Sequence, residues 1–171
     1  RMMPPTYVKA YVKRNKTDAA DAEAICEAVS RPTMRFVPIK APDEQAACMV
    51  LRTRELFVRQ RSQTANAMRA HMAELGIIAA TGMTSIAKLI RILRDAEDTR
   101  LPAAARAALL EMAEQVEMLT TRIEKLDTKI VATVKADEAA RRLTSIPGVG
   151  PIIAATVRAT IQDPAAFRTG R

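Results

Sequence analysis

The sequence predicts an all-α protein organised around two long helices. The first helical stretch, residues 42–75, opens with a proline and two acids and is followed by a glycine, and the second begins at Pro102. Both carry residues at alternating spacings of three and four, the period of helices that pack along a seam. Aromatic residues make up only 3% of the chain, so a sheet that stacks unpaired bases is not expected.

The composition bounds both the size of the core and the kind of partner. The chain has 171 residues, and 49% of them are hydrophobic, which suffices for one sizeable domain or two small ones. Lysine and arginine outnumber aspartate and glutamate by 27 to 19, giving a net charge of +8, which favours a polyanionic partner. No apolar run approaches the roughly 20 residues that a membrane span needs, and no signal peptide is evident. We therefore expect a cytoplasmic protein with no membrane partner.

The cysteines and the histidine do not predict a zinc site or a Cys/His nucleophile. Cys26 and Cys48 are 22 residues apart without a CxxC motif, and there is one histidine. Free buried thiols in a reducing compartment are the expected state.

The N-terminal region predicts a basic arm followed by a short helix. Residues 1–16 contain five basic residues and no acid, so this stretch is either a phosphate-contacting arm or a solvated terminus. Its basic residues are Arg1, Lys9, Lys13, Arg14 and Lys16. Thr17 is placed to cap a helix that runs to about Ser30. Pro32 ends that helix, and residues 36–39 predict a short extended connector.

The first long helix is predicted to run from Pro42 to Leu75, where Gly76 stops it. Its 3-4 spacing gives a partly polar seam, better suited to fixing register than to driving association. The seam residues are Ala46, Val50, Thr53, Phe57, Gln60, Thr64, Ala67 and His71. The helix also carries arginines that either follow a nucleic-acid backbone or lie solvated along the bundle. These are Arg52, Arg54, Arg59, Arg61 and Arg69.

After a loop over residues 76–82, a short amphipathic helix precedes the second long helix. Thr84 and Ser85 are its expected caps, and its apolar face is formed by Ile86, Leu89, Ile90 and Leu93.

The second long helix begins at Pro102 and has a more regular aliphatic seam, typical of a coiled coil. The seam consists of Leu109, Met112, Val116, Leu119, Ile123, Leu126 and Ile130. Either the first long helix or a second copy could cover it. We favour an antiparallel fold-back within the chain, with a homo-oligomer through the coiled coil in addition.

A glycine-rich turn near the C-terminus predicts a phosphate contact. The sequence IPGVGP over residues 146–151 precedes a helix predicted over residues 152–161. It matches the helix-hairpin-helix element, in which glycine allows backbone amides to converge on one anion. The candidate amides are those of Gly148, Val149, Gly150 and Ile152. The alternative is a tight turn between helices without a ligand.

Asp18 and Asp21 are the candidate metal ligands. A spacing of three residues places both carboxylates on one helical face, where two oxygen donors can share a hard cation such as Mg²⁺. Acids in a first turn commonly compensate the helix dipole instead, and the spacing alone favours that reading.

Five segments, in order, are similar to motifs of one known family. They are KTDAADA at 16–22, RPTMRFVP at 31–38, RTRELFVRQR at 52–61, LTSIPGVG at 143–150 and FRTGR at 167–171. They resemble the insertion-sequence transposases with a DEDD, RuvC-like domain, a family that also includes the Piv-type pilin-gene invertases. The resemblance covers nearly the whole chain.

The resemblance implies a DNA strand transferase in three parts. Residues 1–41 would be the end of the RuvC-like α/β domain, including its terminal helix, 42–137 the coiled-coil region, and 138–171 the start of the C-terminal transposase domain. In such enzymes four acids hold Mg²⁺, a serine is the nucleophile, and DNA is paired with an element-encoded guide RNA. Asp18 and Asp21 match the last two acids of the tetrad and so would be catalytic metal ligands.

The departures from the family pattern imply a central fragment. The first aspartate, the glutamate and the nucleophilic serine have no counterpart in these residues. We therefore predict that this chain binds nucleic acid without cutting or joining DNA alone. The alternative function is a non-catalytic DNA-binding adaptor with a coiled-coil dimerisation arm.

Overall fold

The computed structural model describes residues 2–12 and 17–161, and the protein forms helices joined by turns and irregular segments in this part. Within these residues the helices are α1 (Pro5–Lys9), α2 (Asp18–Ser30), α3 (Pro42–Glu74), α4 (Met83–Arg94), α5 (Ala103–Ala136), α6 (Glu138–Thr144) and α7 (Pro151–Thr160). No strand forms there, and the all-α prediction is confirmed. Most of the predicted basic arm (Arg1, Lys13, Arg14, Lys16) and the segment 167–171 lie outside the described residues.

The described chain forms two compact units, the first containing residues 2–12 and 17–45 and the second running from Ala46 to Thr160. In the first unit α1 packs on α2, and α2 buries Ala24 and Ala28. The Val37 amide donates a hydrogen bond of 2.8 Å to the Met2 carbonyl, an isolated bridge in the predicted extended connector. The division into three domains stays a prediction.

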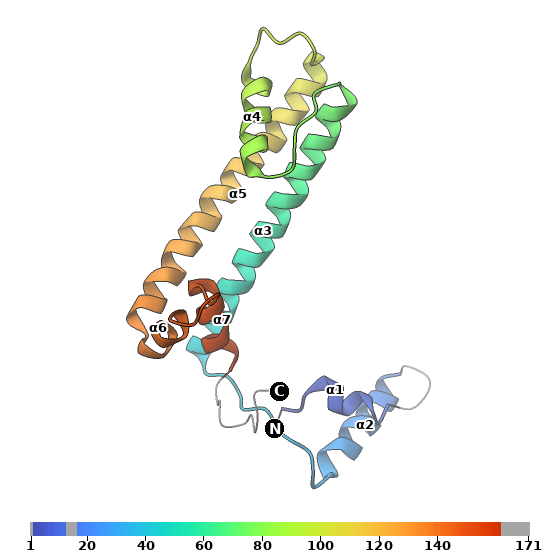
Figure 1. Cartoon of the computed structure of the whole chain (residues 1–171). Helices are drawn as coiled ribbons and strands as arrows, with labels where there is room; N and C mark the ends of the chain where they lie inside the picture. Colours follow the sequence, from blue (N-terminus) through green and yellow to red (C-terminus); the bar gives the residue numbers. More distant parts are fainter. Residues whose placement is uncertain (1, 13–16, 162–171) are drawn as a thin grey trace. The chain divides into compact units, whose positions relative to one another are not determined.

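In the second unit α3 and α5 lie side by side and run in opposite directions (Figure 1). Arg54 in the first half of α3 pairs with Asp127 near the end of α5, whereas Met68 and Met72 share a core with Leu109 near its start. The chain therefore folds back on itself, as the sequence favoured.

The α5 seam is covered within one chain. Five of its seven predicted residues are buried, and the other two, Met112 and Leu126, are half-buried. A homo-oligomer through these same residues stays a prediction, and it would compete with the fold-back for the same surface.

The predicted seam of α3 is wrong, because the helix buries a different face. Val50, Gln60 and His71, three of its predicted members, are exposed. The residues that pack inward are Leu51, Arg54, Val58, Arg61, Ala65, Met68 and Met72. This row also alternates three and four, but two arginines interrupt its apolar character, so sequence alone points to the other row.

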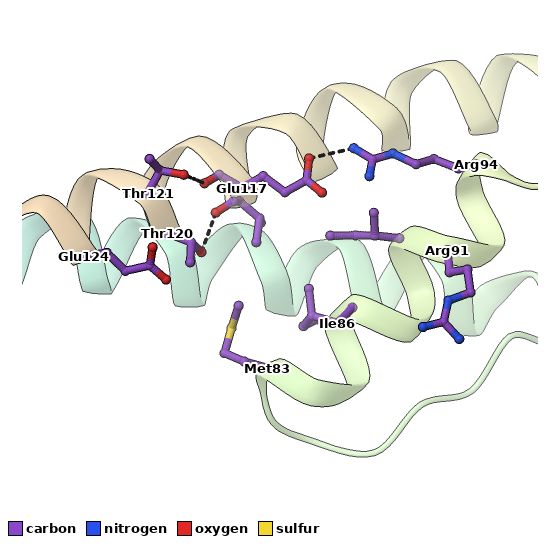
Figure 2. A pocket seen from close by; sticks show the side chains of 11 residues that line it. Met83, Ile86, Arg91, Arg94, Glu117, Thr120, Thr121 and Glu124 are labelled. Carbon is purple, nitrogen blue, oxygen red and sulfur yellow. Dashed lines mark hydrogen bonds and ion pairs between the residues drawn. The ribbon is translucent and has the colours of Figure 1, made fainter.

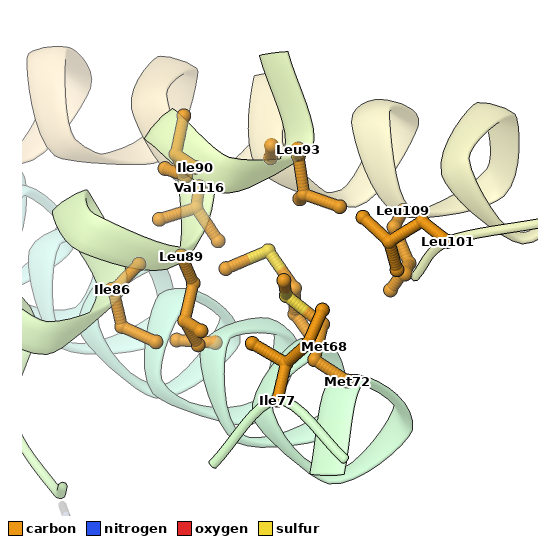
Figure 3. Close-up of a cluster of buried hydrophobic side chains, with 12 residues drawn as sticks. Met68, Met72, Ile77, Ile86, Leu89, Ile90, Leu93, Leu101, Leu109 and Val116 are labelled. Carbon is orange, nitrogen blue, oxygen red and sulfur yellow. The ribbon is translucent and has the colours of Figure 1, made fainter. Parts of the chain in front are cut away.

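The main apolar core lies where side chains of α4 meet those of α3 and α5 (Figure 3). Met68, Met72, Leu89 and Leu93 are no more than 1% exposed. Residues buried this completely supply most of the hydrophobic stabilisation of a small helical unit. The predicted apolar face of α4, from Ile86 to Leu93, is thus confirmed.

Gly76 ends α3 as predicted and steers the chain back into this core. Its φ is +79°, a conformation that glycine adopts without a Cβ penalty. The Gly76 amide donates to the Ala73 carbonyl, and the Ile77 amide donates to the Met72 carbonyl at 2.9 Å. This pairing is the Schellman motif. It places Ile77, only 3% exposed, in the core.

Arg106 of α5 holds the end of α4. Its Nη1 donates to the carbonyl oxygens of Leu93 at 2.7 Å and Asp95 at 2.6 Å, and its Nη2 donates to the Asp98 carbonyl. The last carbonyls of a helix lack partners inside the helix, so this guanidinium both satisfies them and fixes α4 on α5.

A smaller apolar cluster lies at the opposite end of the second unit. It joins Ile130 and Val134 of α5 to Ala140 of α6 and Ala154 of α7. Between the two clusters, both Nε and Nη2 of Arg54 donate to the Asp127 carboxylate, which raises the pKa of the Arg54 guanidinium. A polar pair in a helical seam costs desolvation but disfavours shifted registers.

No helix within residues 2–12 and 17–161 has the length and apolar character needed to cross a membrane.

Candidate functional site

Asp18 and Asp21 lie in the first turn of α2, on the same side, as predicted. Thr17 caps the helix by accepting a hydrogen bond of 3.2 Å from the Ala20 amide. Since the threonine performs the capping, neither carboxylate is needed for that bond. Asp18 is exposed and Asp21 half-buried, so both are accessible to an ion.

The two carboxylates supply only part of a metal site. Among the described residues no group of three or more His, Cys, Asp or Glu side chains could hold a metal ion. Carboxylate oxygens are the donors that Mg²⁺ prefers, and Mg²⁺ commonly binds through one or two carboxylates with water or substrate phosphate completing six positions. The donor chemistry of Asp18 and Asp21 therefore fits Mg²⁺, with the remaining ligands to come from elsewhere.

The glycine turn connects α6 and α7. Gly148 has a φ of +86°, and Gly150 accepts the first bond of α7 from the Ala154 amide at 3.0 Å. Gly148 and Gly150 are exposed, so the turn faces solvent. Pro151 occupies the first helical position, where no amide is required.

One of the four predicted anion-binding amides is already used. The Val149 amide donates to the Ile146 carbonyl at 3.0 Å and so cannot point at a phosphate. The amides of Gly148, Gly150 and Ile152 have no hydrogen-bond partner within the described part of the chain. The candidate anion contact therefore has three available amides, those of Gly148, Gly150 and Ile152, instead of the four that the sequence predicted.

Asp137 holds the two helices of the turn together. Its carboxylate accepts a hydrogen bond of 3.0 Å from the Ala140 amide, which caps α6, and another of 3.0 Å from Nε of Arg158 on α7. These two contacts hold the pKa of Asp137 below its usual value, the Ala140 amide having the larger effect. Asp137 was not among the predicted site residues, although an Asp before a short helix is a capping signal.

Replacing Asp137 with Ala is expected to lower the free energy of unfolding by about 1 kcal/mol at neutral pH, the usual value of a lost N-cap. The folded-state pKa lies below the unfolded value of 3.8. The wild-type advantage is therefore present above that value and disappears as the pH falls through the folded-state pKa. Urea unfolding of both proteins at neutral and acidic pH measures this, with exposed Glu124→Ala as the control. An unchanged midpoint in Asp137→Ala would contradict the capping role.

The five predicted arginines of α3 do not form one surface. Arg52 and Arg59 are exposed, and Arg59 lies 3.9 Å from Glu55. Arg54 and Arg61 belong to the face that packs toward α5, and Arg69 is half-buried, with its Nη1 donating to the Asn66 side chain at 2.7 Å. Of these five arginines, Arg52 and Arg59 are therefore the two that could contact a nucleic-acid backbone without a rearrangement of α3.

Charge is distributed unevenly along the second unit. Residues 46–60 and 122–160, the half that contains the glycine turn, have ten arginines and lysines against five acids. Residues 61–121 have seven of each. We call the first half the basic end. Its exposed cations outside α3 include Lys129, Lys135, Arg141 and Arg142. These residues were not among the predicted nucleic-acid contacts, although the charge along the second half of α5 and in α6 indicates them.

A groove between α4 and α5 has no such charge excess (Figure 2). Ile86 and Val116 contribute to its lining, and the Arg94 guanidinium on α4 donates to the Glu117 carboxylate on α5 at 2.6 Å. The Thr120 hydroxyl donates to the Val116 carbonyl of its own helix. Arg94 and Glu117 are therefore paired with each other, and the threonine hydroxyl is engaged by the backbone of α5.

The structure defines an all-α segment of a basic protein, and comparison with known proteins identifies the family. The DEDD transposase family of the IS110 type matches residues 2–77. The family described as "Transposase IS116/IS110/IS902 family" matches residues 140–171. The chain belongs to these insertion-sequence transposases, as the sequence motifs indicated.

Named relatives agree over essentially the whole chain. The putative transposase y4pF/y4sB of Sinorhizobium fredii is 46% identical over all 171 residues, which are 44% of its length. A probable family 20 transposase of Pseudomonas aeruginosa is 41% identical over the full chain and 51% of its own length. The transposase for insertion sequence element IS1328 of Yersinia enterocolitica is 35% identical over 95% of the chain and 48% of its own length. The chain thus spans about half the length of these relatives. No solved structure matches it.

Proposed function

We propose that this chain supplies nucleic-acid contacts and two metal ligands to a DNA transposase that cleaves and transfers strands with Mg²⁺. The family membership supports the transposase role. The observation that carries the proposal is the basic end of the second unit, which surrounds an exposed glycine turn with positive charge.

The basic end is suited to phosphate rather than to bases. Lysine and arginine side chains neutralise backbone charge without reading sequence. The free amides of Gly148 and Gly150 add hydrogen-bond donors, and a phosphate oxygen can approach them closely because glycine has no side chain. Aromatic residues are too few for base stacking. The partner is therefore a duplex or structured nucleic acid, either DNA or an element-encoded guide RNA.

Asp18 and Asp21 are proposed to hold the catalytic cation. Bound Mg²⁺ at a phosphodiester orients the attack and neutralises developing charge. The chain's own contribution is to present two carboxylates from a rigid helical turn, capped by Thr17 so that the turn does not fray. The proposal requires further ligands and a nucleophile beyond those named in this chain, so we expect no strand cleavage by the 171-residue chain alone.

The nucleic-acid contact predicts a steep dependence on salt. Binding of the chain to labelled duplex DNA and to a structured RNA, followed by fluorescence anisotropy, should weaken linearly in a plot of log affinity against log salt concentration. Lys135→Glu and Arg141→Glu should each reduce the slope by about one, since each removes a phosphate contact. Lys88→Glu, an exposed lysine of α4, is the matched control and should leave it unchanged. Absence of salt-sensitive binding to either nucleic acid would contradict the proposal.

A further inference from the structure

One solvent-facing side of α5 has a charge order that complements itself. Glu114 and Arg122 lie four residues before and after Met118, and Glu111 and Lys125 lie seven residues before and after it. At 3.6 residues per turn these five positions fall on the same side of the helix. All five are exposed, and Met118 is 45% exposed, which is large for an apolar side chain at mid-helix. We call these five residues the symmetric face.

The symmetric face is not covered by the rest of the second unit. The α5 seam that includes Leu119 and Ile123 is buried where α3 packs. The groove beside α4 is bordered by Glu117, Thr120 and Glu124, which lie on another flank of α5. The symmetric face is therefore the third side of the helix and is open to solvent.

Its charges are not consumed by intrachain ion pairs. Within the described residues no salt bridge involves Glu111, Glu114, Arg122 or Lys125. Arg122 contacts the Phe57 ring at 6.0 Å, which orders the guanidinium without neutralising it. These charges are available to a partner.

We propose that the symmetric face pairs with the same face of a second copy, antiparallel, around a twofold axis through Met118. In that arrangement Glu111 of each copy meets Lys125 of the other, and Glu114 meets Arg122. Such an interface is isologous: one patch serves both subunits. Met118 is close to the middle of the 34-residue α5, so the two helices overlap over nearly their whole length, about 50 Å.

Nucleic acid fits this face less well than a second copy. Arg122 and Lys125 attract phosphate, but Glu111 and Glu114 continue the same row and repel a polyanion. Parallel pairing is also disfavoured, because it would place like charges opposite each other. Only an antiparallel second copy places an opposite charge against each of the four charged residues of the symmetric face. The inference does not depend on the proposed transposase activity.

Cysteine cross-linking tests the axis. Met118→Cys, in a Cys26→Ser background that removes the exposed native thiol, should form a disulfide-linked dimer on mild oxidation. Thr128→Cys, also exposed on α5, is the matched control, because its counterpart in the second copy would lie about 30 Å away. Cross-linking of the residue 118 cysteine that does not exceed the control would overturn the proposal.

Charge reversal tests the pairing. Glu111→Lys and Lys125→Glu should each weaken dimerisation about tenfold, since each converts two attractive contacts of the dimer into repulsive ones. The double variant should restore it to within about threefold by exchanging the partners. Sedimentation equilibrium at low salt measures the dissociation constant, and circular dichroism checks that helicity is kept. A monomer at all concentrations, or a double variant no better than the singles, would overturn the proposal. Weaker DNA binding by Lys125→Glu without a change in mass would assign the face to nucleic acid and would overturn it as well.

Discussion

Replacing Asp18 with Asn in a full-length transposase that contains this segment is expected to reduce DNA strand transfer by about a thousandfold or more. Asn keeps the size and polarity of the side chain but removes the charge that a hard cation requires. Loss of the cation removes both orientation of the attack and neutralisation of the developing charge. Asp21→Asn should have a similar effect, because the two carboxylates share one helical turn. A donor–target recombination assay in Mg²⁺ measures the loss.

The same variants separate an enzyme from an adaptor. Nucleic-acid binding should be unchanged in Asp18→Asn, since the basic end lies in the second unit. Glu27→Gln is the matched control: Glu27 is an acid on the same helix, engaged in a surface ion pair with Arg31. It should recombine DNA at close to the wild-type rate. Full recombination by Asp18→Asn would refute the metal-ligand assignment and favour the non-catalytic adaptor.

Replacing Leu93 with Ala is expected to lower the free energy of unfolding of the second unit by about 3 kcal/mol. Leu93 is 1% exposed and lies in the cluster that joins α4 to α3 and α5. Truncation removes buried methyl groups and leaves a cavity that the helices cannot fully close. Urea unfolding followed by circular dichroism measures the change. Because typical domains are stable by only about 5–15 kcal/mol, this one substitution removes a substantial part of the total.

Leu56→Ala is the matched control for the core. Leu56 is 44% exposed on α3, and the same chemical change there should cost less than about 1 kcal/mol. Equal losses from Leu56→Ala and Leu93→Ala would show that α4 does not pack as described.

Helix boundaries were predictable because their signals are local. Pro42, Gly76 and Pro102 act through their own backbone chemistry. The start and the end of α3 and the start of α5 lie close to these residues. The short helix α1 was not predicted, and α6 was expected only as the helix before the glycine turn, without bounds. Both are short, 5 and 7 residues. Isolated helices of that length are not stable, so tertiary packing has to supply what the local sequence lacks.

The two long helices differ in how well their buried faces could be predicted. The α5 seam is a continuous aliphatic row, so the hydrophobic effect selects one face. On α3 two rows compete, and the buried one contains Arg54 and Arg61. A search for apolar residues at helical spacing does not select a row that contains two arginines. Only the position of Asp127 on the facing helix makes Arg54 acceptable there.

The sequence identified the residues of the candidate sites, whereas the fold determines which of their groups are free to bind a ligand. Asp18 and Asp21 share a turn because three-residue spacing on a helix requires it. By contrast, whether the Val149 amide is free depends on the Ile146 carbonyl folding back onto it. Whether Arg52 or Arg54 faces solvent depends on which side of α3 meets α5.

The sequence by itself determined the helical class, the transposase family, and the positions of the acids and of the glycine turn. The helical class and the two local features depend on interactions between residues a few positions apart. The family follows from motifs that are read directly in the sequence. The tertiary structure alone decided which face of α3 is buried and that positive charge gathers at one end of the hairpin. Those outcomes depend on contacts between residues about 70 positions apart, such as Arg54 and Asp127, whose partners no local pattern specifies.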